Sequence, residues 1–339
     1  MPFANIVGHR RMLSLFTRAI ARETLPPSLL LAGPRGIGKR RTAAAIATTL
    51  NCLRPRRSDT FEIDACGECP SCRRIARGVH PDVIVVEPEE SGTIKTDQVR
   101  SVIDAANYRP FEGRRRVVIV DDADALVTQA QNALLKTLEE PPSASVFLLV
   151  SSMSDALLST VRSRCRPLRL GELTPVEVAG VLVRDHQYSE AQAHAAAAEA
   201  GGSVGRALEA RDVDIGEARE AAQRLLQQTA RISDPARRLE AARDLVGKVS
   251  GAPREREQLA VRLRVLSSLL RDLGLLASNA GAVSLANTDL RGDLNRLTDA
   301  FDGERTARAF GAVDRALVAL DSRHNAGPKV VADWLALQI

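Results

Sequence analysis

The sequence predicts a doubly wound α/β domain over residues 1–168, followed by segments that are helical throughout. Short runs such as 83–86 and 117–120 are apolar at every position, which is typical of parallel strands covered by helices on both faces. These runs alternate with helical patterns. The strand pattern ends at Leu170, and the length of 339 residues suits two or three domains.

Four strands are expected in the first half of the chain, at 29–32, 83–86, 117–120 and 146–150. Helices are expected at 40–51 and at 127–140, the second ended by Pro141 and Pro142.

The second half is expected to contain two helical parts. Thr174, Pro175 and Glu177 form a capping-box pattern that begins a helix, and an alanine-rich helix over 189–200 ends at Gly201-Gly202. We expect a small helical unit over 169–212 and an all-helical domain over 213–339. The breaks expected in the latter lie near 234–235, 251–253, 281 and 327–328.

A glycine-rich loop follows the first expected strand and opens a helix. Residues 33–40 read G-P-R-G-I-G-K-R, which fits G-x-x-x-x-G-K in the strand–loop–helix context that this motif requires. Gly33, Gly36 and Gly38 let backbone N–H groups turn toward phosphates, and Lys39 would reach the terminal phosphates. The alternative is that the loop survives only as a turn.

The position that should hold Mg²⁺ departs from the motif. It is Arg40 in place of Ser or Thr, and Thr42 lies two residues further along the helix. Asp121 ends the third strand in the metal position of an acidic strand, and Asp122 follows it. Because Asp122 is shorter than Glu, it would hold an attacking water poorly. We therefore expect this chain not to hydrolyse ATP, with bound ATP or ADP left open.

Four cysteines have the spacing of a metal centre. Cys52, Cys66, Cys69 and Cys72 give C-x13-C-x2-C-x2-C, and four thiolates suit a closed, structural Zn²⁺ site. The expected zinc module, residues 52–79, is inserted between a helix and the next strand. Free thiols or an iron–sulfur cluster are the alternatives.

Arg164 lies in a Ser-Arg-Cys tripeptide at the end of the α/β domain. An arginine projected from this edge can stabilise charge on a phosphate bound by a neighbouring subunit. The alternative is a surface arginine that pairs with a local acid.

Composition narrows the function. Aromatic residues make up 3% of the chain, which argues against a protein that stacks single-stranded bases on rings. The net charge of +5 is compatible with nucleic acid. With neither a signal peptide nor a membrane-spanning segment in the sequence, we expect a cytoplasmic protein.

Together these motifs resemble the AAA+ clamp-loader subunits of bacterial DNA polymerase III. The stretch N-A-L-L-K-T-L-E-E-P-P over 132–142, followed by Ser163-Arg164-Cys165, carries most of the resemblance. Val7-Gly8-His9 and residues 93–100 add to it. The resemblance covers residues 1 to about 210 and implies an AAA+ domain, a helical lid and a C-terminal collar.

Two branches of this family compete. Arg40 and Asp122 favour the delta-prime branch, as does Gly205, which stands where motor subunits have a sensor arginine, with Arg206 shifted by one. The resemblance then implies a heteropentamer with gamma/tau and delta subunits that loads the sliding clamp on primed DNA, with Arg164 acting in trans. The alternatives are a gamma/tau-type ATPase motor and a zinc-module nucleic-acid-binding protein.

Overall fold

The computed structural model describes residues 1–58, 60–89, 91–209, 215–231, 234–246, 252–278, 285, 287, 290–320 and 326–339. The chain divides into two compact units. The first comprises Met1–Ala193 and Gly201–Gly205, and the second comprises His194–Ala200 and Arg206–Ile339. The boundary expected between 212 and 213 lies outside the described residues, so the three-part division remains a prediction.

The first unit is built on a five-stranded sheet in the order β2-β3-β4-β1-β5, and every pairing is parallel. The four expected strands are confirmed, and a fifth, β5, joins them at the edge beside β1. The strands are β1 Ser28–Ala32, β2 Val83–Val86, β3 Arg116–Val120, β4 Ser145–Ser151 and β5 Arg166–Arg169.

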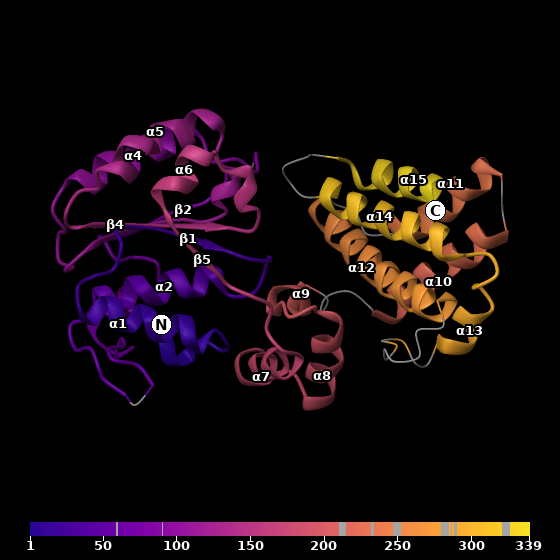
Figure 1. Ribbon diagram of the computed structural model, residues 1–339, viewed down its shortest axis with the longest axis horizontal. Helices are drawn as coiled ribbons and strands as arrows, with labels where there is room; N and C mark the ends of the chain where they lie inside the picture. Colours follow the sequence, from indigo (N-terminus) through magenta and orange to yellow (C-terminus); the bar gives the residue numbers. More distant parts are fainter. Residues whose placement is uncertain are drawn as a thin grey trace. The chain divides into compact units, whose positions relative to one another are not determined.

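Helices cover both faces of this sheet (Figure 1), as the fully apolar runs predict. One face packs on α4 (Thr96–Asn107), α5 (Thr128–Glu139) and α6 (Ser159–Arg164), and the other on α1 (Arg10–Ala21) and α2 (Lys39–Leu50). Successive strand residues alternate between the two cores, so Leu30 packs in the first core while Leu29 and Leu31 pack in the second.

Shorter helices complete the first unit. Thr174 caps α7 through a capping box with Glu177, which confirms the predicted helix start. The other elements are α3 Pro70–Ala76, α7 Pro175–His186, α8 Glu190–Glu199 and α9 Val204–Glu209, with 3-10 helices at Phe3–Asn5, Ala123–Ala125 and Ser154–Ala156. Two of them, α8 and α9, contain residues of both units.

Among the described residues of the second unit, every regular element is a helix. Its core gathers around the longest helix, α12, whose Leu263, Leu266 and Leu270 are fully buried. The breaks predicted at 234–235 and 327–328 precede helices, whereas 251 and 281 lie outside the described residues. The helices are α10 Ile215–Arg231, α11 Pro235–Val246, α12 Ala252–Ala277, α13 Arg291–Asn295, α14 Gly303–Leu320 and α15 Pro328–Gln338.

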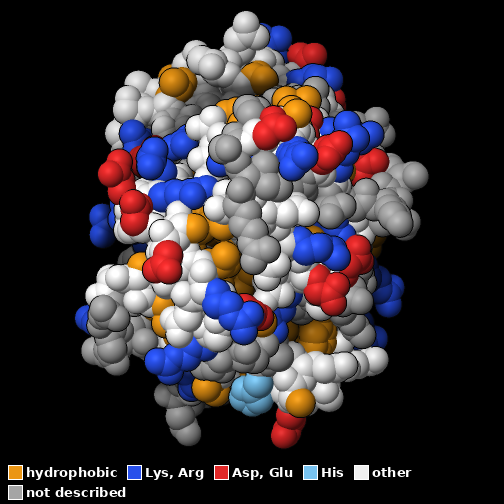
Figure 2. All heavy atoms as spheres, turned by 90° about the vertical axis from the view of Figure 1, so that its right-hand side faces the viewer, with side chains coloured by type: hydrophobic (Ala, Val, Ile, Leu, Met, Phe, Trp, Pro, Cys, Tyr) orange, Lys and Arg blue, Asp and Glu red, His pale blue; other side chains and the backbone are white. Residues whose placement is uncertain are grey.

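Charges of both signs are interspersed on the surface drawn in Figure 2, with apolar side chains between them. The net charge of +5 therefore does not form one continuous basic patch on that face. Within the described ranges, no helix is both long enough and apolar enough to cross a bilayer.

A buried aspartate fixes the turn that leads into β3. The Asp82 side chain is fully buried and accepts hydrogen bonds from the backbone N–H groups of Phe111, Glu112 and Gly113 at 2.7 to 2.9 Å. Arg116 Nη2 donates to Asp82 Oδ1 at 2.9 Å. Burial alone raises the pKa of Asp82, but these four donors outweigh it and hold the pKa below its usual value.

Asp82→Asn is expected to destabilise the α/β unit by about 3 kcal/mol, because it leaves the buried Arg116 guanidinium without its counter-ion. Since the folded pKa is lowered, the carboxylate contributes stability above the unfolded pKa, and this contribution is lost as the pH falls through the folded value. Hydrogen exchange and urea unfolding at pH 7 and at about pH 3.5 measure both effects.

The exposed Asp104 on α4 provides the matched control, since Asp104→Asn makes the same chemical change without a buried partner. Faster amide exchange at 111–113 is expected only for Asp82→Asn. Equal exchange at 111–113 in the two variants would remove the role assigned to Asp82.

Candidate functional site

The glycine-rich loop joins the carboxyl end of β1 to the start of α2, as the motif requires. Gly36 and Gly38 have φ angles of 76° and 99°, in the left-handed region that glycine adopts without strain. Because β1 lies inside the sheet, the loop is at the edge where α/β proteins bind ligands. The strand–loop–helix context is therefore present.

Lys39 is held inside the loop. Its ammonium donates to the carbonyl oxygens of Gly33 and Pro34 at 2.8 and 2.7 Å and to Ser152 Oγ at 3.0 Å. Burial lowers the pKa of Lys39, opposed mainly by the nearby Asp122. Ser152 lies just after β4, the strand that pairs with β1.

Arg40 turns toward two carboxylates at the neighbouring strand ends. Its guanidinium lies 3.0 Å from Asp121 Oδ2 and forms an ion pair with Glu87, which follows β2. Asp121 follows β3 and is 14% exposed, so burial raises its pKa while Arg40 opposes that rise. Sequence reasoning missed Glu87, although its place directly after a strand parallel to β3 was a usable signal.

The group that Mg²⁺ requires in this loop is not provided. Arg40 stands at the position where the motif has a Ser or Thr hydroxyl, and its guanidinium forms an ion pair with Asp121. Thr42 does not replace the hydroxyl, since its Oγ1 donates within α2 to the Gly38 carbonyl at 3.1 Å. The residues present therefore do not fit a magnesium ion held in the usual way.

Two acids beside the loop differ in their surroundings. Asp122 has a φ of 46°, in the left-handed region, and begins a short 3-10 helix. Asp124, which sequence reasoning did not single out, is 8% exposed and accepts a hydrogen bond from Ser152 N–H at 3.1 Å. Asp124 thereby joins the end of β3 to the end of β4.

Residues 203–205 pack directly against the loop. Ser203 Oγ donates to the Arg35 carbonyl at 2.8 Å, and Gly205 N–H donates to the Gly36 carbonyl at 3.0 Å. A Cβ on Gly36 would lie 2.3 Å from Ser203 Oγ and 2.9 Å from Gly205 Cα. This close backbone packing occurs at Gly205, the position that the resemblance compares with the sensor arginine of motor subunits.

Arg164 is the last residue of α6. Its Nε and Nη2 donate to Glu139 Oε2 at 3.1 and 3.0 Å, and its Nη1 donates to the Thr160 carbonyl at 3.1 Å. The local ion pair considered as the alternative is thus present, while 31% of the Arg164 side chain is exposed. Cys165, next to it, is buried, which raises the pKa of its thiol to about 12.

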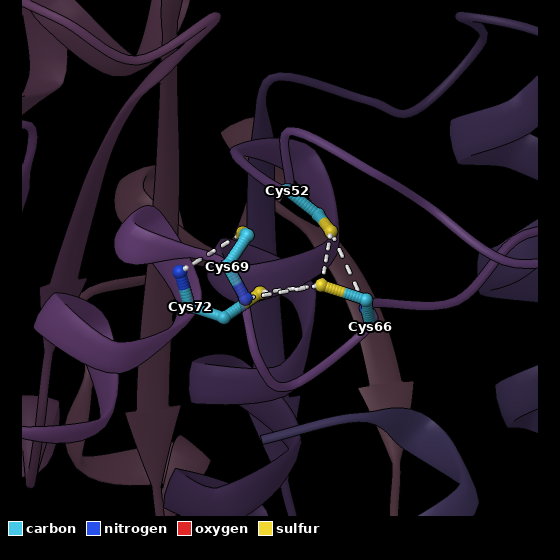
Figure 3. A group of neighbouring side chains, drawn as sticks. All are labelled: Cys52, Cys66, Cys69 and Cys72. Carbon is cyan, nitrogen blue, oxygen red and sulfur yellow. Dashed lines mark hydrogen bonds between the residues drawn. The ribbon is translucent and has the colours of Figure 1, made fainter.

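The four cysteines meet in one buried cluster between α2 and α3 (Figure 3). Their sulfur atoms all lie within 4.8 Å of one another, and the Cys52 and Cys66 sulfurs are 3.6 Å apart. A tetrahedral ion with bonds of about 2.3 Å requires sulfur separations of about 3.8 Å. The arrangement can hold a metal ion.

Backbone groups around the cluster favour thiolates. The N–H groups of Cys66, Cys69 and Cys72 point to the sulfurs of Cys52, Cys66 and Cys69 at 3.3, 3.3 and 3.5 Å. Burial raises the pKa values of all four thiols. In Cys66 and Cys69 backbone N–H donors outweigh burial and lower the pKa, to about 6 in Cys69, whereas the pKa values of Cys52 and Cys72 stay raised. These donors suit a negatively charged ligand set.

Comparison with known proteins finds a similar family and similar subunits for the α/β unit. The family described as "DNA polymerase III, delta subunit" matches residues 8–174. The chain is 45% identical to the DNA polymerase III subunit delta' of Pseudomonas aeruginosa over 153 residues, which are 45% of each chain. It is 32% identical to the tau/gamma subunit of Haemophilus influenzae over 176 residues, 52% of this chain and 25% of that one.

The matched regions span less than half the length of these curated relatives. A solved gamma-subunit-related protein of Thermotoga maritima overlays 96% of this chain and 98% of its own, with a TM-score of 0.44 and 18% identity. Residues 8–174, which make up most of the α/β unit, are therefore similar to the DNA polymerase III delta-subunit family.

Proposed function

We propose that this chain is a delta-prime-type clamp-loader subunit that does not hydrolyse ATP itself. The ion pair between Arg40 and Asp121 carries this proposal, because it puts a guanidinium where hydrolysing P-loop sites hold Mg²⁺. The 45% identity to the delta' subunit of Pseudomonas aeruginosa supports the choice of branch.

In this proposal residues 1–168 are an AAA+ module, 169–212 a helical lid and 213–339 a collar domain. The collar assembles with gamma/tau and delta subunits into a five-membered ring. That ring loads the sliding clamp on primed DNA, in the cytoplasm and as part of a DNA polymerase holoenzyme. The second unit has its own large cluster of buried apolar side chains, which supports an independently packed collar.

Arg164 is proposed to act in trans on a nucleotide bound by a neighbouring subunit. Its pair with Glu139 joins side chains that are 31% and 59% exposed. Such exposed pairs contribute about 0–1 kcal/mol, so a phosphate of higher charge can take the guanidinium from Glu139. The position of Arg164 at the end of α6, near the surface, supports this role.

A gamma/tau-type motor is the second candidate, because the same region is 32% identical to a tau/gamma subunit. This candidate requires magnesium at the loop. Arg40 and the close packing of Gly205 on Gly36 argue against it.

The cysteine cluster is proposed to hold a structural Zn²⁺. Four sulfurs leave no ligand position for a reacting water, so the ion would supply stability and no chemistry. Cys52, Cys66, Cys69 and Cys72 would each contribute one thiolate.

The purified chain is expected to show no Mg²⁺-dependent ATP turnover above background, because Arg40 replaces the metal-binding hydroxyl and pairs with Asp121. A Lys39→Ala variant should give the same baseline. A measurable rate in the native chain that disappears in Lys39→Ala would instead identify the motor candidate.

Arg164→Ala is expected to leave assembly intact and to lower the ATPase rate of the reconstituted loader. The neighbouring site that Arg164 serves should lose about 10³-fold of its rate, leaving only the turnover of the other sites. Gel filtration measures assembly, and clamp- and DNA-stimulated phosphate release measures the rate.

Arg162→Ala is the matched control for this experiment. Arg162 lies on the same helix and also pairs with a local acid, Asp155, at 2.5 Å. The trans role of Arg164 is wrong if both variants retain the full rate, or if both lose it equally.

The purified protein is expected to contain one Zn²⁺ per chain, and Cys66→Ala to lose it together with thermal stability. Cys165→Ala, which removes the buried thiol outside the cluster, should keep the metal. Elemental analysis by mass spectrometry measures the zinc content of each protein. A metal-free native protein or a dominant iron signal would reject the zinc assignment.

A further inference from the structure

Three consecutive basic residues open α2, at the end of a helix that disfavours positive charge. Each of the three positive charges is paired with a different set of oxygen atoms. Lys39 is bound by loop carbonyls, and Arg41 pairs with Asp185 at 3.2 Å. Arg40 is the one that reaches across to the strand ends, where Glu87 and Asp121 hold it.

The two carboxylates come from adjacent parallel strands, β2 and β3, whose carboxyl ends meet at one edge of the sheet. Oxygen atoms gathered in this way are the usual ligands of Mg²⁺. Here both are ion-paired to one guanidinium. The positive charge that balances these two carboxylates is the Arg40 side chain and not a bound metal ion.

An incidental surface ion pair would have a different character. Exposed pairs contribute little and usually join two solvated side chains. Asp121 is only 14% exposed and lies 3.0 Å from the Arg40 guanidinium, which opposes the rise in pKa that burial causes. Asp122 adds further negative charge nearby. The strand ends therefore require a cation.

We propose that the Arg40 guanidinium permanently replaces the divalent cation of this loop, so that the site excludes Mg²⁺ and meets a nucleoside di- or triphosphate only in its metal-free form. A guanidinium donates hydrogen bonds at about 2.7–2.9 Å to carboxylate or phosphate oxygens, keeps its positive charge, and is covalently part of the chain. This proposal concerns the site alone and holds whether or not the chain acts in clamp loading.

The test compares the full-length native chain with Arg40→Thr and with Arg41→Thr. Arg40→Thr restores a hydroxyl and frees Glu87 and Asp121. Arg41→Thr removes the same charge one residue on, and its partner Asp185 keeps Arg184 at 2.8 Å. The probe is Mn²⁺, followed by its electron paramagnetic resonance signal and by the melting temperature. Buffer without added divalent cation serves as the metal-free arm, because a chelator would also attack the cysteine cluster.

The native chain and Arg41→Thr are expected to leave Mn²⁺ free and to melt at the same temperature with and without it. Arg40→Thr should melt about 2–4 °C lower in metal-free buffer, bind Mn²⁺ and recover at least half of that loss. An Arg40→Thr protein that folds but ignores Mn²⁺ overturns the proposal.

A second measurement keeps the proposal testable if Arg40→Thr does not fold. Mn²⁺ binding to the native chain that disappears in Asp121→Asn would show that the site takes a metal despite Arg40, and would overturn the proposal. A native chain whose affinity for a fluorescent ATP analogue is unchanged by Mg²⁺ supports it. A tenfold gain in that affinity with Mg²⁺ contradicts it.

Discussion

The parallel pairing of β3 with β4 and of β4 with β1 decides where each charged group of the glycine-rich loop lies. Parallel strands present their carboxyl ends at one edge, so the residues that follow them converge there. This edge collects Glu87, Asp121 and Ser152 beside the loop that carries Lys39 and Arg40. Lys39 and Arg40 are adjacent in the sequence, whereas Glu87, Asp121 and Ser152 are far from them and from one another. The sheet order is therefore the constraint on which the chemistry of the site depends.

The contact between two glycines shows how the loop is fixed from outside the sheet. A Cβ on Gly205 would lie 2.8 Å from Gly36 Cα, closer than real Cβ contacts allow. An arginine at 205 would begin with that Cβ and force the segments apart. The chain thus has a close backbone contact where the resemblance to motor subunits places a phosphate sensor, and the hydrogen bond from Gly205 N–H to Gly36 strengthens it.

Much of the fold was predictable because its signals are local. Four strands are continuous apolar runs, and the cysteine spacing predicted a cluster that the structure brings together. β5 escaped prediction because Arg166–Arg169 contains proline and two arginines, and only its pairing with β1 makes it a strand. The roles of Glu87 and Asp82 depend on partners distant in sequence, Arg40 and residues 111–113, which no local pattern reveals.

Two buried aspartates join the cysteine module to the rest of the α/β unit. Asp64 accepts the N–H groups of Phe3 and Ala4 at 2.7 and 2.9 Å, which ties the start of the chain to the module. On its other side, Nδ1 of His80 accepts the Asp82 N–H and Nε2 lies 3.1 Å from Ser71 Oγ on α3.

Each aspartate accepts backbone N–H groups of a neighbouring segment, so a shift at either end of the module would break these hydrogen bonds. Arg74 of α3 adds an ion pair to Glu112 at 2.8 Å, in the same turn that Asp82 fixes. Helix α3, which carries one of the clustered cysteines, is therefore linked by these contacts to the turn before β3. Because Asp121 follows β3, the turn that contacts the cysteine module and the carboxylate that pairs with Arg40 lie at opposite ends of one strand.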